Sequence, residues 1–80
     1  MTKELFAQKL KTLEFKKVTS ANGAKGYLVS VPRADGTEYS FSCYAAPDMK
    51  AKKAIDYAWE MILRRVAREW GYEGDITAFK

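Results

Sequence analysis

The chain has 80 residues, a formal net charge of +4 and a hydrophobic fraction of 48%. This length suits a single domain over residues 1–80, and the hydrophobic fraction is too high for a disordered chain. The basic charge is moderate, so it favours an anionic partner only where the basic residues cluster.

Several classes of chemistry are excluded by residue type. Histidine is absent, which removes histidine-dependent triads, general bases and metal sites. The single cysteine, Cys43, has no histidine partner and lies on the apolar face of a predicted strand. This position favours a small buried residue over a nucleophile. We therefore expect a protein that is not an enzyme, with no catalytic residue, no metal ligand and no cofactor.

The same composition bears on location. One cysteine cannot form an internal disulfide, and small secreted domains usually depend on several. Residues 1–5 contain no apolar segment of the kind a signal peptide needs, and the apolar runs are far shorter than the about 20 residues that cross a bilayer. We expect a cytoplasmic protein without a membrane partner.

Residues 2–13 are predicted to form a short helix that Thr2 can cap. Its apolar face is expected to pack on a sheet and comprises Leu5, Phe6, Leu10 and Leu13. Residues 14–20 are ambiguous between a strand and a tail of this helix. Residues 21–24 indicate a turn, because asparagine and glycine tolerate positive φ.

Residues 26–31 and 37–44 are predicted to form an antiparallel hairpin. Pro32 ends the first strand, and residues 33–36 suit a type I turn with a glycine bulge. One face of the hairpin is apolar and carries Tyr27, Val29, Val31, Tyr39, Phe41 and Cys43. The other face is a second candidate surface, either for another chain or for the N-terminal helix, and carries Leu28, Ser30, Ser40, Ser42 and Tyr44.

A long helix is predicted from Pro47, which suits a first helical position, to Trp70, with Gly71 as its stop. Its core stripe comprises Ala51, Ile55, Ala58, Trp59, Ile62, Val66 and Trp70. Residues 72–80 either form a short strand or dock on the rest through Ile76 and Phe79. The expected fold is therefore α+β: a short N-terminal helix, a two- or three-stranded antiparallel sheet, and a long C-terminal helix packed on one sheet face.

The outward face of the long helix is basic and also carries an aromatic residue and a methionine. It comprises Lys50, Lys53, Tyr57, Met61, Arg64, Arg65 and Arg68, with Arg65 at its margin. A charged outer face can be ordinary solvated surface. Tyrosine and arginine are nevertheless enriched among binding hot spots, methionine adapts to a partner's shape, and arginine pairs with planar anions. We take this face as the candidate partner-binding surface.

Three lysines, Lys50, Lys52 and Lys53, lie in the first turns of the same helix, where positive charge opposes the helix dipole. This placement either hints at a bound anion or is a tolerated feature of a solvated helix start. If residues 14–20 form a strand, the order α-β-β-β-α resembles a double-stranded RNA-binding domain, whose second helix opens with lysines facing phosphates. The chain departs from that family in having no Gly-Pro-x-His loop between strands, and Tyr57 and Met61 are not part of its pattern.

In size and organisation, the hairpin and the alanine-rich helix ending in Trp70-Gly71 resemble small phage-encoded anti-CRISPR inhibitors. That resemblance implies a non-enzymatic inhibitor in the host cytoplasm, bound to an acidic surface of a nucleic-acid-handling protein complex. The alternative is a domain that binds nucleic acid directly through the same basic face. A homodimer joined through a sheet edge or the outer sheet face is a third interpretation.

Overall fold

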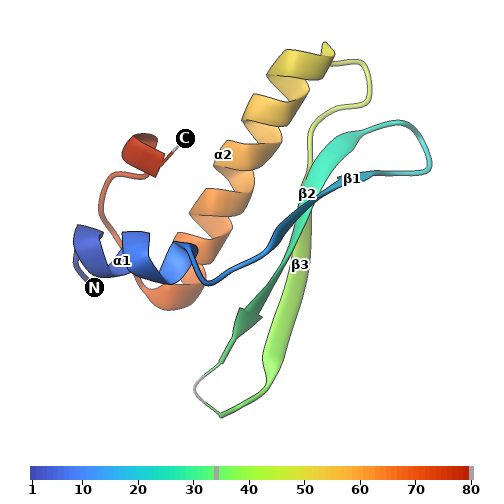
Figure 1. Cartoon of the computed structure of the whole chain (residues 1–80). Coiled ribbons are helices and arrows are strands. Elements are labelled where there is room, and N and C mark those ends of the chain that lie inside the picture. Colours follow the sequence, from blue (N-terminus) through green and yellow to red (C-terminus); the bar gives the residue numbers. More distant parts are fainter. Residues whose placement is uncertain (34, 80) are drawn as a thin grey trace.

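The computed structural model describes residues 1–33 and 35–79, and these confirm the α+β fold (Figure 1). In chain order the elements are α1 (Lys3–Leu10), β1 (Phe15–Thr19), β2 (Lys25–Pro32), β3 (Glu38–Tyr44), α2 (Ala51–Trp70) and a short 3₁₀ helix, η1 (Thr77–Phe79). Ala34 of the predicted hairpin loop and Lys80 of the predicted tail lie outside the described residues.

The sheet has three antiparallel strands in the order β1-β2-β3, so the ambiguous segment 14–20 contains a strand. Phe15 pairs with Val29, and Val29 in turn pairs with Phe41, which places all three on one face. Both connections contain a glycine with a φ of +87°, Gly23 and Gly36, as their sequences predict. The alternation of β2 and β3 therefore gives one apolar and one more polar sheet face, and β1 adds Phe15 to the apolar face.

Local residues set the bounds of both helices. The Thr2 hydroxyl accepts from the Leu5 amide at 3.1 Å, which confirms the predicted cap of α1. α2 begins at Ala51, four residues after the predicted Pro47, because residues 46–49 form a turn and Lys50 is extended, with ψ at 143°. Its end is as predicted, with Gly71 left-handed at a φ of 72°.

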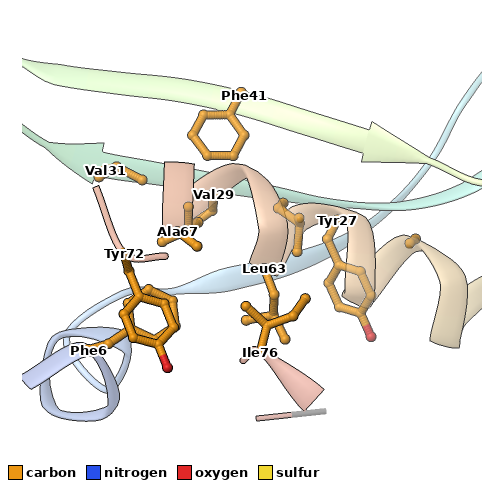
Figure 2. Packing of buried hydrophobic residues seen from close by; sticks show 12 residues of the cluster. Phe6, Tyr27, Val29, Val31, Phe41, Leu63, Ala67, Tyr72 and Ile76 are labelled. Carbon is orange, nitrogen blue, oxygen red and sulfur yellow. The ribbon is translucent and has the colours of Figure 1, made fainter. Parts of the chain in front are cut away.

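α2 packs on the apolar face of the sheet, and its buried arc is wider than a single stripe (Figure 2). Ala54, Leu63 and Ala67 are buried although they lie outside the predicted core stripe, and Ala51, a member of that stripe, is exposed. The reason is that two neighbours cover this helix. The sheet covers one side, and the segment after Gly71 returns over a second side.

The chain ends meet in an aromatic cluster. The Phe6 ring stacks on Tyr72 with centroids 4.2 Å apart, and it contacts Phe79 edge-on at 5.2 Å and Trp70 at 5.8 Å. Phe6 is buried, whereas Leu5, expected on the same apolar face, is 45% exposed. The C-terminal segment therefore docks instead of forming a strand, and α1 packs on it and on the end of α2 more than on the sheet.

Within the described part of the chain, no helix combines the length and the apolar character that a bilayer crossing requires.

Candidate partner-binding surface

Five of the predicted site residues form a continuous line along α2, on the side away from the sheet. We call this line the basic strip; it comprises Lys53, Tyr57, Met61, Arg64 and Arg68, all exposed. Successive members lie three or four residues apart, the spacing at which helical side chains are neighbours. Tyr57 and Met61 are 45% and 37% exposed in the middle of the line. The strip therefore offers apolar contact area between cationic side chains.

Both strip arginines are exposed, and Arg64 also has an ion-pair partner on α2. The Arg64 guanidinium lies 3.7 Å from the Glu60 carboxylate one turn before it, yet the Arg64 side chain stays 59% exposed. Arg64 and Arg68 border a shallow hollow of about 450 Å³, whose other wall is the 71–77 segment. Both arginines are exposed to solvent, and Glu73 and Asp75 line the same hollow.

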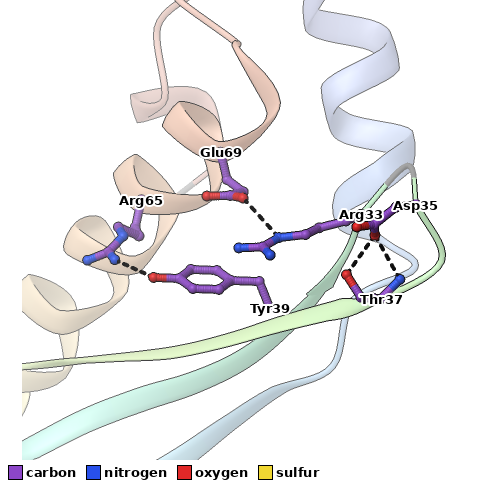
Figure 3. Close-up of polar contacts among 6 residues, drawn as sticks. All are labelled: Arg33, Asp35, Thr37, Tyr39, Arg65 and Glu69. Carbon is purple, nitrogen blue, oxygen red and sulfur yellow. Dashed lines mark hydrogen bonds and ion pairs between the residues drawn. The ribbon is translucent and has the colours of Figure 1, made fainter.

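Arg65 does not belong to this line, because its side chain lies back over β3 (Figure 3). Its Nη2 donates to the Tyr39 hydroxyl at 2.9 Å, and its guanidinium carbon lies 5.1 Å from the Phe41 ring centroid. Beside it, Arg33 lies over the Tyr39 ring at 4.6 Å and pairs with Glu69 at 3.8 Å. These contacts hold α2 against β3. The structure therefore gives Arg65 a packing role that the sequence pattern did not indicate.

Lys50, the last predicted site residue, is the exposed N-cap of α2 and gathers with other lysines at one end of the molecule. α2 has no acidic residue in its first turn and no side-chain bond at its N-cap. The β1–β2 hairpin lies at the same end (Figure 1), held there by a 2.8 Å bond from the Ala45 amide to the Lys25 carbonyl. We call the resulting group the lysine end; it comprises Lys17, Lys25, Lys50, Lys52 and Lys53.

Sequence reasoning missed Lys17 and Lys25, because only the pairing of β1 with β2 brings them to this end. Among the described residues, no carboxylate lies within ion-pair distance of the five ammonium groups of the lysine end. Their charge is therefore directed at solvent or at a partner.

The outer sheet face is open. Ser30, Ser40 and Ser42 are exposed there, with the Ser30 and Ser40 hydroxyls 2.7 Å apart. The Tyr44 ring is 42% exposed and covers Gly26, where a Cβ would come within 2.6 Å of it. The buried faces of both helices belong to the core cluster on the opposite side of the sheet, so α1 does not cover this face.

Two groups have altered acidity. Burial raises the pKa of the Cys43 thiol, which is half-buried and has no activating base beside it in the described structure. Hydrogen bonds from the Thr37 hydroxyl and amide lower the pKa of the exposed Asp35 carboxyl. The described residues contain no group of three or more side chains that could together hold a metal ion.

Comparisons with protein-family models, with curated proteins and with solved structures gave no match for this chain. The resemblances to anti-CRISPR inhibitors and to double-stranded RNA-binding domains therefore stay expectations.

Proposed function

We propose that this chain is a cytoplasmic binding protein without catalytic chemistry of its own, which docks the basic strip of α2 on an acidic surface of a protein partner. An inhibitor of the anti-CRISPR type, bound to a nucleic-acid-handling complex, is the form of this function that we favour.

The observation that carries the proposal is the exposure of Tyr57 and Met61 between cationic neighbours. A folded chain usually buries large apolar side chains, and α2 has a wide core arc in which to do so. These two instead lie on the helix face opposite the sheet, with Lys53 before them and Arg64 after them. Apolar anchors with a charged rim are the usual anatomy of a protein interface.

The charge of the strip indicates the chemistry of the partner. Lys53, Arg64 and Arg68 contribute three positive charges, and Glu60 offsets one of them. Arginine can bind a carboxylate with two parallel hydrogen bonds, so acidic side chains on the partner suit the two arginines. Such pairs contribute mainly to the association rate and to partner choice, while Tyr57 and Met61 supply the apolar contact.

The test compares two variants that change the net charge equally. Arg64→Glu/Arg68→Glu reverses two charges on the strip, and Lys3→Glu/Lys11→Glu reverses two exposed charges at α1. Each protein is used as bait in an affinity pulldown, with circular dichroism as the check on folding. We expect the first variant to lose a partner that the wild type and the second variant retain. Equal recovery by all three proteins would remove the strip from consideration.

A second candidate function, direct binding of nucleic acid, is favoured by the lysine end. Five lysines gather there without an ion pair in the described structure, and α-β-β-β-α is the element order of the double-stranded RNA-binding domain that the chain resembles. Lysines that neutralise phosphates release counterions, so affinity should fall with salt by roughly one unit of log-log slope per contact.

Titration with duplex RNA, duplex DNA and single strands across a range of salt separates the two candidates. For phosphate binding, we expect Lys17→Gln/Lys25→Gln to weaken binding and to reduce the salt slope by about two units. Tyr57→Ala/Met61→Ala should leave that slope unchanged. An absence of binding to any nucleic acid at low salt would exclude the second candidate.

A further inference from the structure

The edge of β3 presents unpaired backbone groups. The hairpin bond from the Arg33 amide to the Thr37 carbonyl and the bond from Ala45 to Lys25, both 2.8 Å, fix which residues bond to β2. Successive residues of an antiparallel strand direct their backbone groups to opposite sides. With the register of this pair, the N–H and C=O groups that point away from β2 belong to Glu38, Ser40, Ser42 and Tyr44.

The two edges of the sheet differ in composition. β1, at one edge, carries Lys16 and Lys17 in its centre, and lysines are a common means of keeping an edge strand from pairing with another chain. β3, at the other edge, has no charged residue, proline or glycine from Tyr39 to Tyr44. Apart from Glu38 at its start, the edge of β3 therefore lacks the charges and proline that prevent strand addition.

We propose that β3 pairs antiparallel with β3 of a second copy of this chain, which joins the two three-stranded sheets into one continuous sheet. An antiparallel edge is complementary to itself about a two-fold axis. With Phe41 on the axis, Ser40 of one copy lies opposite Ser42 of the other, and Glu38 lies opposite Tyr44. In this register every outward N–H and C=O from Glu38 to Tyr44 finds a partner in the other copy.

Charge complementarity favours the antiparallel sense. The end of the molecule at which β3 begins carries Asp35 and Glu38, while Arg33 at that end is already paired with Glu69. The end at which β3 finishes is the lysine end, whose five lysines outnumber the carboxylate of Asp48 in the turn before α2. Antiparallel pairing brings each acidic end to the partner's lysine end, twice by symmetry, whereas parallel pairing would bring like charges together.

The contact forms through the backbone and the outer face of the sheet, because the inner side of β3 is already covered. Arg65 already covers Phe41 and bonds to Tyr39 on the inner side of β3. The side chains that meet across the new pair on the outer face are the small, exposed Ser40 and Ser42. A strand-edge contact buries less than the about 1,600 Å² of a standard interface, so we expect a dissociation constant of micromolar order or weaker.

Two variants address the edge, and a third serves as a matched control. Ser42→Pro removes an amide that points away from β2, a position at which edge strands tolerate proline. Ser40→Lys/Ser42→Lys places four ammonium groups together across the axis. Ser30→Lys adds a lysine to the same outer face, but on the central strand.

Sedimentation equilibrium over a range of protein concentration measures self-association, and circular dichroism checks the fold. We expect the wild type and Ser30→Lys to associate as dimers, and both edge variants to do so at least about tenfold more weakly, since each loses two symmetry-related hydrogen bonds or gains like-charge repulsion. A wild type that stays monomeric up to about 1 mM would overturn the proposal, because any association would then be negligible. So would a folded Ser42→Pro variant that dimerises like the wild type, or equal loss of the dimer in Ser30→Lys.

Discussion

Replacing Arg65 or Arg64 by alanine should separate two neighbouring arginines with different roles. Arg65→Ala removes a hydrogen bond to Tyr39 worth about 0.5–1.5 kcal/mol and a cation–π contact over Phe41 worth about 0.5–1 kcal/mol. The gain in helix propensity from alanine is small, so we expect the free energy of unfolding to fall by about 1–2 kcal/mol. Arg64→Ala removes only an exposed pair with Glu60, worth about 0.3–0.5 kcal/mol.

Urea denaturation followed by tyrosine and tryptophan fluorescence measures this difference directly. With equal slopes in denaturant, a shift of the midpoint reports stability alone. For a domain of this size, a loss of 1 kcal/mol also lowers the melting temperature by about 4–8 °C. If Arg65→Ala and Arg64→Ala lowered the free energy of unfolding equally, the packing role of Arg65 between α2 and β3 would be refuted.

In partner binding we expect the larger effect from Arg64→Ala, although Arg65→Ala has the larger effect on stability. Arg64 belongs to the basic strip, so Arg64→Ala should weaken capture of the partner while leaving the protein stable. Arg65→Ala should leave capture unchanged at temperatures where the variant is fully folded. If Arg65→Ala abolished capture without loss of stability, the partner surface would extend to β3, and the strip as defined would be too narrow.

Three further outcomes are expected. Phe6→Ala should destabilise the fold by about 3–5 kcal/mol, because the ring is buried among three aromatic side chains, while the neighbouring Leu5→Ala, at an exposed position, should change stability by less than about 0.5 kcal/mol in the same urea titration. Gly71→Ala should cost about 1 kcal/mol, since it forces a side chain into the left-handed region at the end of α2; a thermal melt showing no loss would contradict this. Alkylation of Cys43 should be slower than that of an unfolded thiol at neutral pH, because burial raises the pKa of this thiol. The contribution of the thiol to the free energy of unfolding should be fully present below its ordinary pKa and should decline as pH rises through the raised pKa. An alkylation rate unchanged by urea would contradict burial of that thiol.

Local sequence signals predicted the ends of several elements. Thr2 capped a helix, Gly23 and Gly36 closed the hairpins, and Gly71 ended α2, since each depends on backbone geometry that its own residue type permits. The start of α2 was predicted wrongly at Pro47, because proline is equally compatible with the turn that precedes the helix.

Sequence periodicity does not show how many other segments of the chain pack against a helix. A single-stripe pattern predicted burial of Ala51 but not of Leu63 or Ala67, because the C-terminal segment covers α2 from a direction that only the tertiary fold defines. The separation of Arg65 from the basic strip also depends on tertiary contacts that periodicity does not show. On a helical wheel it lies at the margin of the outward face, and its contact with Tyr39 decides its side.

The aromatic cluster that joins the chain ends has a consequence for the order of events during synthesis. Phe6 leaves the ribosome well before its partners Tyr72 and Phe79, which lie far behind it in the sequence. α1 has eight residues, too few for a stable isolated helix, so it cannot hold its structure while it waits. The sheet and the first turns of α2 can pack together before residues 72–79 have emerged, but α1 docks only after they have. A stalled or shortened chain would therefore leave the apolar side of residues 1–13 accessible to chaperones and proteases.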